Sequence, residues 1–173
     1  MPLYLVRHAH AVSKEEDSRR PLSERGRAQV RTLAAFFRSN NLFTPAHVWH
    51  SSLIRSRETA ELLLVGLASE AALVESPGLQ PEDAPDEITT RINAITSAVN
   101  VAIVGHQPQL GALATLLVRG KEGPELFDFK KGAVLALDRT TGAHKTTGQP
   151  RWLVSWLITP DLLAVKPATE IDL

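Results

Sequence analysis

Arginine, histidine and serine side chains directly follow several apolar runs of the chain. LYLV ends at Arg7 and His8, HVWH ends at Ser51 with Arg55 four residues later, and VAIVG ends before His106. A guanidinium group can bind two phosphate oxygens at once, and an imidazole can act as a nucleophile or as a hydrogen-bond donor. If these residues meet in space, they form a site for a doubly charged tetrahedral anion, for which phosphate is the obvious candidate.

The apolar runs are predicted strands, because they are too apolar on average for a sheet with one face in water. They lie at 3–6, 47–51, 72–75 and 101–105. In an open parallel sheet the carboxyl ends of the strands share one edge, and ligands bind at that edge. The polar residues that end three of these runs are therefore expected to lie together.

Helical patterns separate the predicted strands. Apolar residues recur at the i, i+3, i+4 and i+7 spacing of a helix with one buried face, so the leucine stripes are predicted core. The predicted helix starts are Ser23, Ser51 or Ser52, Asp86 and Pro108. The third helix carries an apolar side formed by Ile88, Ile92, Ile95 and Val99.

Strand and helix alternate four times, which predicts a three-layer α/β/α fold with a mostly parallel central sheet. Two more apolar runs, 133–138 and 152–158, flank a Gly- and Thr-rich connection. They predict an antiparallel strand pair that completes the sheet at the C-terminal end. The charged stretches 13–20 and 119–132 are predicted exposed loops, and the first lies close to the opening motif.

The composition indicates one soluble globular domain over residues 1–173. The chain is 43% hydrophobic, and its 19 Lys and Arg residues balance 19 Asp and Glu residues, so no overall field favours nucleic acid or an anionic membrane. There is no cysteine, which excludes disulfides and thiolate catalysis and leaves only histidine and carboxylate as zinc ligands. No signal peptide or membrane-spanning run is evident, which favours a cytoplasmic location.

The motifs resemble those of the histidine phosphatase superfamily, which has the phosphoglycerate mutase-like fold. LYLVRHAHA is similar to its R-H-G signature, SSLIRSRETA to its S-P-L-x-R-A-x-Q-T-A motif, and VGHQP to the motif that supplies a second histidine. The stretch RPLSERGRAQ, the closing WLITP and the small size are most similar to the SixA-like phosphohistidine phosphatase branch. Three motifs in the expected order, in a matching strand and helix context, are a specific signal.

The resemblance implies a phosphatase that forms a phosphohistidine intermediate on His8. Arg7, Arg55 and His106 would hold the phosphoryl oxygens, and a hydrogen bond to a loop carbonyl would fix the tautomer of His8. No metal or cofactor is required. The implied substrate is phosphohistidine on a protein, such as a phosphotransfer domain or a phosphocarrier, with a role in signal transduction.

Two further residues are predicted to bind substrate. Arg20 would reach the phosphate or a partner protein, and Gln107 lies where the Pro108 helix directs backbone N–H groups toward an anion. The sequence also departs from the family pattern, because Ala9 replaces the glycine of R-H-G and Ser52 replaces the proline of S-P-L. The proline change is expected to matter little at a helix start.

The proton donor for the leaving group cannot be assigned by alignment. Asp17, Glu82, Asp83 and His10 are the candidates. A phosphate monoester benefits from such an acid by a factor of roughly 10² to 10⁴, because its alkoxide leaving group is strongly basic. An imidazole leaving group needs the acid much less, so the weak signal for an acid is compatible with a phosphohistidine substrate.

Three alternative functions remain open. A metal-dependent hydrolase could begin with H-x-H, but its usual barrel needs about 250 residues, and the later partners here are mainly arginines, which repel cations. A small-molecule phosphomonoesterase or phosphoglycerate mutase-like enzyme would use the same site. A non-catalytic phosphate-binding module is also possible, although the presence of His8 disfavours it.

Other polar residues are predicted to have ordinary structural roles. His10 is expected to be a bystander in a loop, and His47, His50 and His144 have no better claim to chemistry. Arg57 and Glu58 are expected on the solvated face of a helix.

Overall fold

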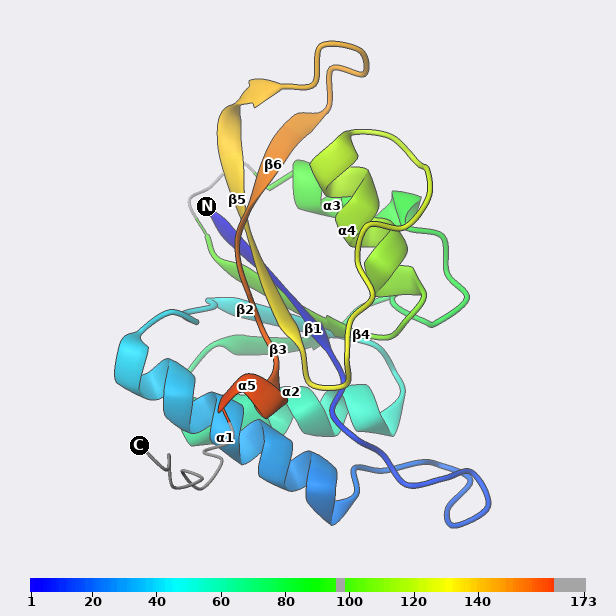
Figure 1. Cartoon of the computed structure of the whole chain (residues 1–173), viewed down its shortest axis with the longest axis vertical. Helices are drawn as coiled ribbons and strands as arrows, with labels where there is room; N and C mark the ends of the chain where they lie inside the picture. The colour runs from blue at the N-terminus through cyan, green and yellow to red at the C-terminus, as the bar shows by residue number, and fades with distance from the viewer. Residues whose placement is uncertain (96–98, 164–173) are drawn as a thin grey trace, which may run out of the picture.

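One six-stranded mixed sheet forms the centre of the protein (Figure 1). The computed structural model describes residues 1–95 and 99–163, so residues 164–173 of the predicted domain lie outside the described part. The strands are β1 (Pro2–Arg7), β2 (His47–His50), β3 (Ala72–Glu75), β4 (Val101–Gly105), β5 (Val134–Ala143) and β6 (Pro150–Ile158). They lie in the order β3-β2-β4-β1-β5-β6.

The predicted strand directions are confirmed. β1 pairs with β4 in parallel, β2 pairs in parallel with β4 and β3, and β5 is antiparallel to both β1 and β6. The final hairpin is longer than predicted, because β5 runs on to Ala143 and β6 begins at Pro150. The segment after Asp138 was predicted as connection, but Arg139 pairs with Trp152 and Ala143 with Pro150, with a register irregularity between the two pairs.

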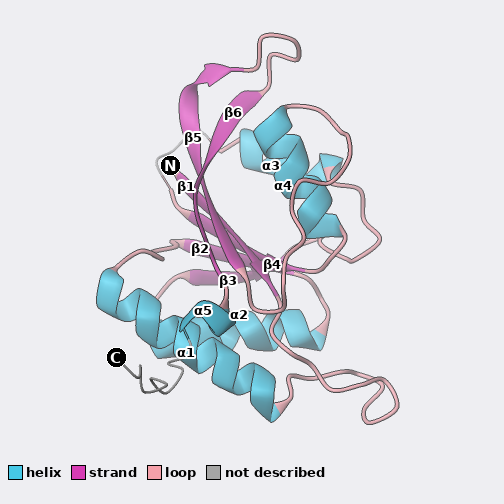
Figure 2. Cartoon of the chain, in the orientation of Figure 1, coloured by secondary structure: helices cyan, strands magenta, loops and turns pink. Residues whose placement is uncertain are grey.

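Helices cover both faces of the sheet, which gives the predicted three layers (Figure 2). They are α1 (Glu24–Asn40), α2 (Ile54–Leu67), α3 (Asp86–Asn93), α4 (Gln109–Arg119) and α5 (Pro160–Leu163). α1, α2 and α5 pack on one face, where Phe37 and Leu63 meet Val6 and Val104 of the sheet. α3 and α4 pack on the other face, where Ile88 and Leu113 contact the opposite side of the same strands. The leucine stripes are therefore core, as predicted.

Three local predictions were wrong. β3 is exposed along its whole length because it forms an edge of the sheet with no helix over it. α3 ends at Asn93, so Ile95 and Val99 pack on the core from outside the helix, and residues 96–98 between them lie outside the described part. The N-cap of α2 is Leu53, which makes no side-chain cap hydrogen bond, rather than a serine.

The register of β1 places the chemistry-bearing segments side by side. Arg7 lies opposite Gly105 of β4, so His106 follows at the same edge as His8. On the other side, Val6 lies opposite Val134, and because β5 is antiparallel it is the start of this strand that reaches the carboxyl end of β1. Figure 1 shows the loop before β5 and the loop after β1 at the same end of β1. The predicted edge is thus built from both flanks.

The first turn of α1 is pinned against the segment that follows His8. Ser23 caps the helix by accepting the N–H of Gly26, and its own N–H donates to the carbonyl of His10 at 3.0 Å. The His10 ring contacts Ser23 Oγ through Nδ1 at 2.8 Å, and its N–H donates to Gln29 Oε1. A Cβ on Gly26 would lie 2.0 Å from the carbonyl oxygen of His10. Only glycine allows the helix to approach this closely.

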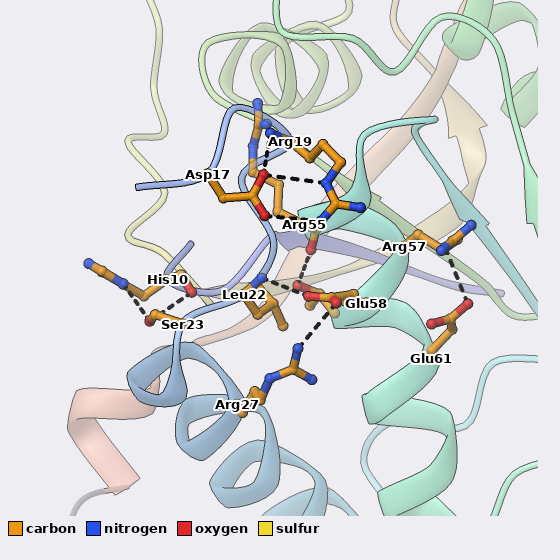
Figure 3. A network of polar contacts seen from close by, with 11 residues as sticks. His10, Asp17, Arg19, Leu22, Ser23, Arg27, Arg55, Arg57, Glu58 and Glu61 are labelled. Atoms are coloured by element: carbon orange, nitrogen blue, oxygen red, sulfur yellow. Dashed lines mark hydrogen bonds and ion pairs between the residues drawn. The ribbon is translucent and has the colours of Figure 1, made fainter. Parts of the chain in front are cut away.

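Glu58 is not on a solvated helix face, which corrects the prediction. Its carboxylate accepts the N–H of Leu22 at 2.6 Å and forms an ion pair with Arg27 of α1 at 3.2 Å, as Figure 3 shows. Arg57 is exposed and pairs with Glu61 one turn along α2. Glu58 therefore joins α2, α1 and the loop between β1 and α1, because its side chain leans back over the turn before it.

We expect Gly26→Ala to lower the free energy of unfolding by about 1–3 kcal/mol, because the new methyl group collides with rigid backbone rather than with a flexible side chain. Urea denaturation measures the effect. Gly142→Ala is the matched control, since its Cβ would meet only Thr140 Oγ1, at 3.7 Å. Equal loss of stability in both variants would contradict the close approach of α1 to His10.

Candidate active site

Two histidines and two arginines meet at the carboxyl edge of the sheet. The rings of His8 and His106 lie with their centroids 5.0 Å apart. The positive charges of Arg7 and Arg55 act on both histidines and lower the pKa of each. The structure therefore brings together the four side chains that the strand-end argument placed at one edge.

His8 has a defined hydrogen-bond partner on one side of its ring. Its Nδ1 lies 2.7 Å from the carbonyl oxygen of Ala9. A carbonyl can only accept, so Nδ1 carries the proton and Nε2 keeps its lone pair. His8 is only 6% exposed, and its own N–H donates to the carbonyl of Gly105 on β4. The imidazole is thus held neutral, in the tautomer that leaves the lone pair of Nε2 unprotonated.

Ser51 orients the second histidine. Its Oγ lies 2.6 Å from Nε2 of His106 and also accepts the N–H of Leu53 at 3.3 Å. We assign the hydroxyl proton of Ser51 to the bond with Nε2, which places the ring proton of His106 on Nδ1. Nδ1 is buried without a partner among the described residues. A buried donor of this kind can bond to an oxygen of an anion at the site.

Arg7 is fixed at the end of β1 by the loop before β5. One of its terminal nitrogens donates to the carbonyl of Phe129, and its Nε is buried without a partner among the described residues. Burial lowers the pKa of Arg7, and the nearby exposed carboxylate of Asp128 raises it in part. The guanidinium keeps its charge at neutral pH, because this residue type is protonated far above that range.

Buried hydroxyl groups dock the first turn of α2 onto the strand ends. Thr59 Oγ1 accepts the N–H of Ala9 at 3.1 Å and donates to the carbonyl of Arg55 at 2.7 Å. Ser56 Oγ donates to the carbonyl of Val104 and accepts the N–H of Ser51. One helix turn is thereby attached to β1, β2 and β4 together, and this attachment sets the position of Arg55 against His8.

Burial keeps both histidines neutral. It is the largest cause that lowers the pKa of His8 to about 3, with contributions from Arg55, Arg7 and Lys131. Burial also dominates the lowering of the pKa of His106 to about 3. Both the low-dielectric surroundings and the nearby cations disfavour the imidazolium form.

Arg20 and Gln107 occupy different surroundings. Arg20 lies near Arg55, whose pKa is lowered by burial and by the charge of Arg20. Its Nε donates to the carbonyl of Val12, which holds it at the neck of the loop after β1. Gln107 donates its side-chain amide to the carbonyl of Phe127, so it joins the start of α4 to the loop before β5. Its predicted role in substrate binding remains a prediction.

Sequence reasoning assigned no chemical role to Lys131 or to the buried hydroxyls of Ser51, Ser56 and Thr59. Lys131 precedes Gly132, whose N–H donates to the carbonyls of Arg7 and His8, and its charge acts on His8. The predicted strand 133–138 begins two residues after Lys131, but its place beside β1 was not predicted, so no signal in the sequence pointed to Lys131. Ser51, Ser56 and Thr59 could have been noticed as three hydroxyls within one motif, although only the fold shows their partners.

The four candidate proton donors are not equivalent. The pKa of Asp17 is lowered by its hydrogen bonds with Arg19, so this carboxyl is ionised at neutral pH and is a poor proton donor. Asp83 accepts the N–H of Gln80, and His10 is bound to Ser23. Glu82 is exposed, and its negative charge acts on Arg55. Among these four, Glu82 has a direct electrostatic link to the site arginines.

The described residues also bear on metal binding and membrane insertion. Within residues 1–95 and 99–163, no three His, Asp or Glu side chains are grouped in a way that could hold a metal ion. In the same part of the chain, each helix is too short or too polar to cross a bilayer.

The comparisons with known proteins agree with this fold. The family model of the histidine phosphatase superfamily (branch 1) matches residues 3–83. An uncharacterized protein of Picosynechococcus is 29% identical over 142 residues, which cover 79% of this chain and 84% of that protein. The predicted resemblance to the histidine phosphatase superfamily is thus confirmed over residues 3–83.

Solved structures share the fold. The protein histidine phosphatase SixA complexed with tungstate has a TM-score of 0.77 at 22% identity, and the match covers 95% of this chain and 100% of that one. The α-ribazole phosphatase from Shigella flexneri has a TM-score of 0.64 at 18% identity, over 90% of this chain and 96% of that one. The fold is thus shared with SixA and with an α-ribazole phosphatase, whose name indicates a small-molecule substrate.

The buried histidines predict a pH dependence of stability. Below its ordinary pKa of about 6.5, each histidine takes up a proton in the unfolded chain, whereas the folded chain takes it up only near pH 3. The free energy of unfolding should therefore fall with pH from about 6.5 downward, by about 2 kcal/mol per histidine at pH 5. Urea titrations at pH 8 and pH 5 measure it.

In that experiment His8→Gln should lose about half of the pH-dependent change. His47→Gln, at an exposed position on β2, is the control and should keep the wild-type change. An unchanged pH dependence in His8→Gln would show that His8 is not held neutral by the fold.

Ser51→Ala should destabilise the protein by about 1–3 kcal/mol, because it leaves Nε2 of buried His106 without a partner. It should also release the tautomer of His106. Nitrogen-15 NMR of the ring reports the tautomer, and urea denaturation reports the stability. Ser52→Ala, the neighbouring exposed serine, should change neither quantity appreciably. An unaltered His106 spectrum in Ser51→Ala would refute the positioning role of Ser51.

Proposed function

We propose that this chain is a phosphatase of the histidine phosphatase superfamily, which transfers the phosphoryl group of its substrate to Nε2 of His8 and then to water. The observation that carries the proposal is the state of His8. Its Nδ1–H is bound to the Ala9 carbonyl and its pKa is about 3, so Nε2 offers a lone pair at neutral pH.

In the first step the lone pair of His8 Nε2 forms a bond to phosphorus. The bond from phosphorus to the leaving group breaks, and its electron pair stays with the leaving atom. Arg7 and Arg55 face the equatorial oxygens and stabilise the charge that spreads over them, while Nδ1–H of His106 donates to one of those oxygens. These groups are preorganised by the strand ends and by the first turn of α2.

In the second step a water oxygen attacks phosphorus and the bond to Nε2 breaks. The imidazole leaves as a neutral ring once the water proton has been released, and inorganic phosphate departs. The site regenerates without an external reactant, because water supplies the oxygen and the proton. The SixA protein that shares this fold is described as a complex with tungstate, a tetrahedral oxyanion, which supports a phosphate site of this shape.

We assign protein phosphohistidine as the substrate class. Of the four candidate proton donors, Asp17, Asp83 and His10 are engaged elsewhere, and Glu82 is exposed near Arg55. A site with a weak proton donor favours a leaving group that departs without one, and the imidazole of phosphohistidine meets this requirement better than an alkoxide. Phosphotransfer domains and phosphocarriers carry such a group.

A small-molecule phosphomonoesterase is the second candidate. Two observations favour it. The fold is shared with an α-ribazole phosphatase, and the charge of Glu82 acts on Arg55, where a carboxyl could protonate an alkoxide. Substrate comparison separates the two candidates, because the preferred leaving group differs.

The test is dephosphorylation of a phosphohistidine protein, with phosphoserine and sugar phosphates in parallel. The wild-type protein should favour phosphohistidine and become labelled with an acid-labile phosphoryl group on His8. His8→Ala should lose the label and at least about 10³-fold in kcat/KM, since the nucleophile is removed. Activity should persist in a chelator.

His47→Ala removes an exposed histidine at the amino end of β2, away from the carboxyl ends of the strands, and should keep both label and rate. Higher kcat/KM on phosphate monoesters would instead support the small-molecule candidate. Phosphate binding without turnover or label would support the non-catalytic module.

A further inference from the structure

Three cations surround the site beyond the two arginines that face the phosphoryl group. They are Arg20, Arg25 and Lys131, and we call them the cationic rim. Arg25 is exposed, whereas Arg20 and Lys131 are half-buried. Burial lowers the pKa of Lys131, and the charges of Arg7, Arg20, Arg25 and Arg55 lower it further. These groups are therefore close enough to repel one another.

Each member of the cationic rim is carried to the site by a different segment. Lys131 sits in the turn before β5, where the N–H of Gly132 donates to the carbonyl of His8 at 3.1 Å. Arg20 closes the loop after β1, and its backbone N–H donates to the carbonyl of Asp17. Arg25 is carried by the first turn of α1, which is pinned to His10. The fold thus converges three positive charges on one mouth.

Ion pairing distinguishes the rim from the other cations on these elements. Arg27, Arg31 and Arg57 each pair with a glutamate on α1 or α2. Across residues 1–95 and 99–163, by contrast, no carboxylate lies within 4.0 Å of a rim nitrogen.

Within the described residues, three carboxylates lie near the mouth, but none of the three forms an ion pair with a site or rim cation. Glu15 acts on Arg20, Glu82 on Arg55 and Asp128 on Arg7, and all three carboxylates are exposed. The positive charge of the rim therefore remains available to a ligand.

The position of Arg25 is electrostatically unfavourable for folding. It lies in the first turn of α1, where the partial positive charge of the helix end disfavours a cation. The adjacent Glu24 is directed to Arg31 rather than to Arg25. The charge of Arg25 repels its neighbours and opposes the helix dipole, so these charge interactions do not stabilise the fold. A role in binding a ligand explains its place at the mouth.

We propose that the cationic rim docks an acidic protein surface around the phosphohistidine of the substrate, so that Arg20, Arg25 and Lys131 recognise carboxylates that flank the phosphorylated residue. This rests on the proposed function. Arg7 and Arg55 match the two charges of the phosphoryl group, so the three further cations require negative charge outside it. Charge of this kind, spread over three segments, fits a macromolecular surface and accelerates its encounter with the site.

The experiment uses three substrates of one design. Two are peptides with a central phosphohistidine, flanked in one case by four glutamates and in the other by four glutamines, and the third is phosphoimidazole. Wild type should show about tenfold higher kcat/KM on the glutamate peptide at low salt, and the difference should shrink at high salt. The Arg25→Gln variant should lose part of this preference and retain its rate on phosphoimidazole within about twofold. The triple variant Arg20→Gln, Arg25→Gln, Lys131→Gln should lose the whole preference.

Arg38→Gln is the matched control, because it removes an exposed cation from the opposite end of α1. It should keep the wild-type preference. Fluorescence anisotropy of the two peptides without phosphate measures docking independently of turnover. Wild type and Arg38→Gln should favour the glutamate peptide, and the triple variant should not.

The outcomes separate the two proposals. Equal affinity and equal kcat/KM for both peptides would overturn the proposal that the rim docks an acidic surface. A preference that survives in the triple variant would also overturn it. A rim that instead governs affinity for a small bisphosphate, with no peptide preference, would overturn it as well. Selective binding of the glutamate peptide without hydrolysis of phosphoimidazole would support the rim and refute the proposed function.

Discussion

The docking of the first turn of α2 onto the strand ends is the constraint on which the site depends. The hydroxyl group of Thr59 forms a hydrogen bond with the backbone of Ala9. The hydroxyl group of Ser56 forms hydrogen bonds with the backbone of Val104 and Ser51. These bonds are buried, so breaking one leaves an unsatisfied polar group in the core. As a result, Arg55 is placed against His8 by the framework, and its long side chain needs to adjust only at its tip.

The same arrangement resolves a conflict between burial and charge. Two guanidinium groups must share a small volume with two imidazoles, and protonation of either ring would add a further like charge. Burial lowers the pKa of His8 and His106 enough that both rings stay neutral beside Arg7 and Arg55. The hydrogen bonds to Ala9 and Ser51 then decide which nitrogen carries each proton. Two neutral imidazoles thus differ in which ring nitrogen carries the proton.

Around this centre, the surrounding segments are tied to backbone rather than to one another's side chains. α1 is fixed by its close approach at Gly26, and the loop after β1 is fixed to α2 through Glu58 (Figure 3). The loop before β5 is fixed to Arg7 and Gln107 through the carbonyls of Phe129 and Phe127. The loops of the mouth are therefore attached to the framework, and the side chain of Arg20 is held by the carbonyl of Val12.

The sequence alone determined the layer architecture, the strand directions and the edge at which His8, Arg55 and His106 meet, because hydrophobic periodicity and the alternation of strands and helices are visible in local stretches of the chain. Only the tertiary structure decided what Glu58, Ser51 and Lys131 do. Their partners lie on segments that are distant in sequence, so no local pattern can distinguish a buried bond or a converging cation from a solvated side chain. The length of α3 and the exposure of β3 were decided in the same way, since both depend on which neighbours cover them.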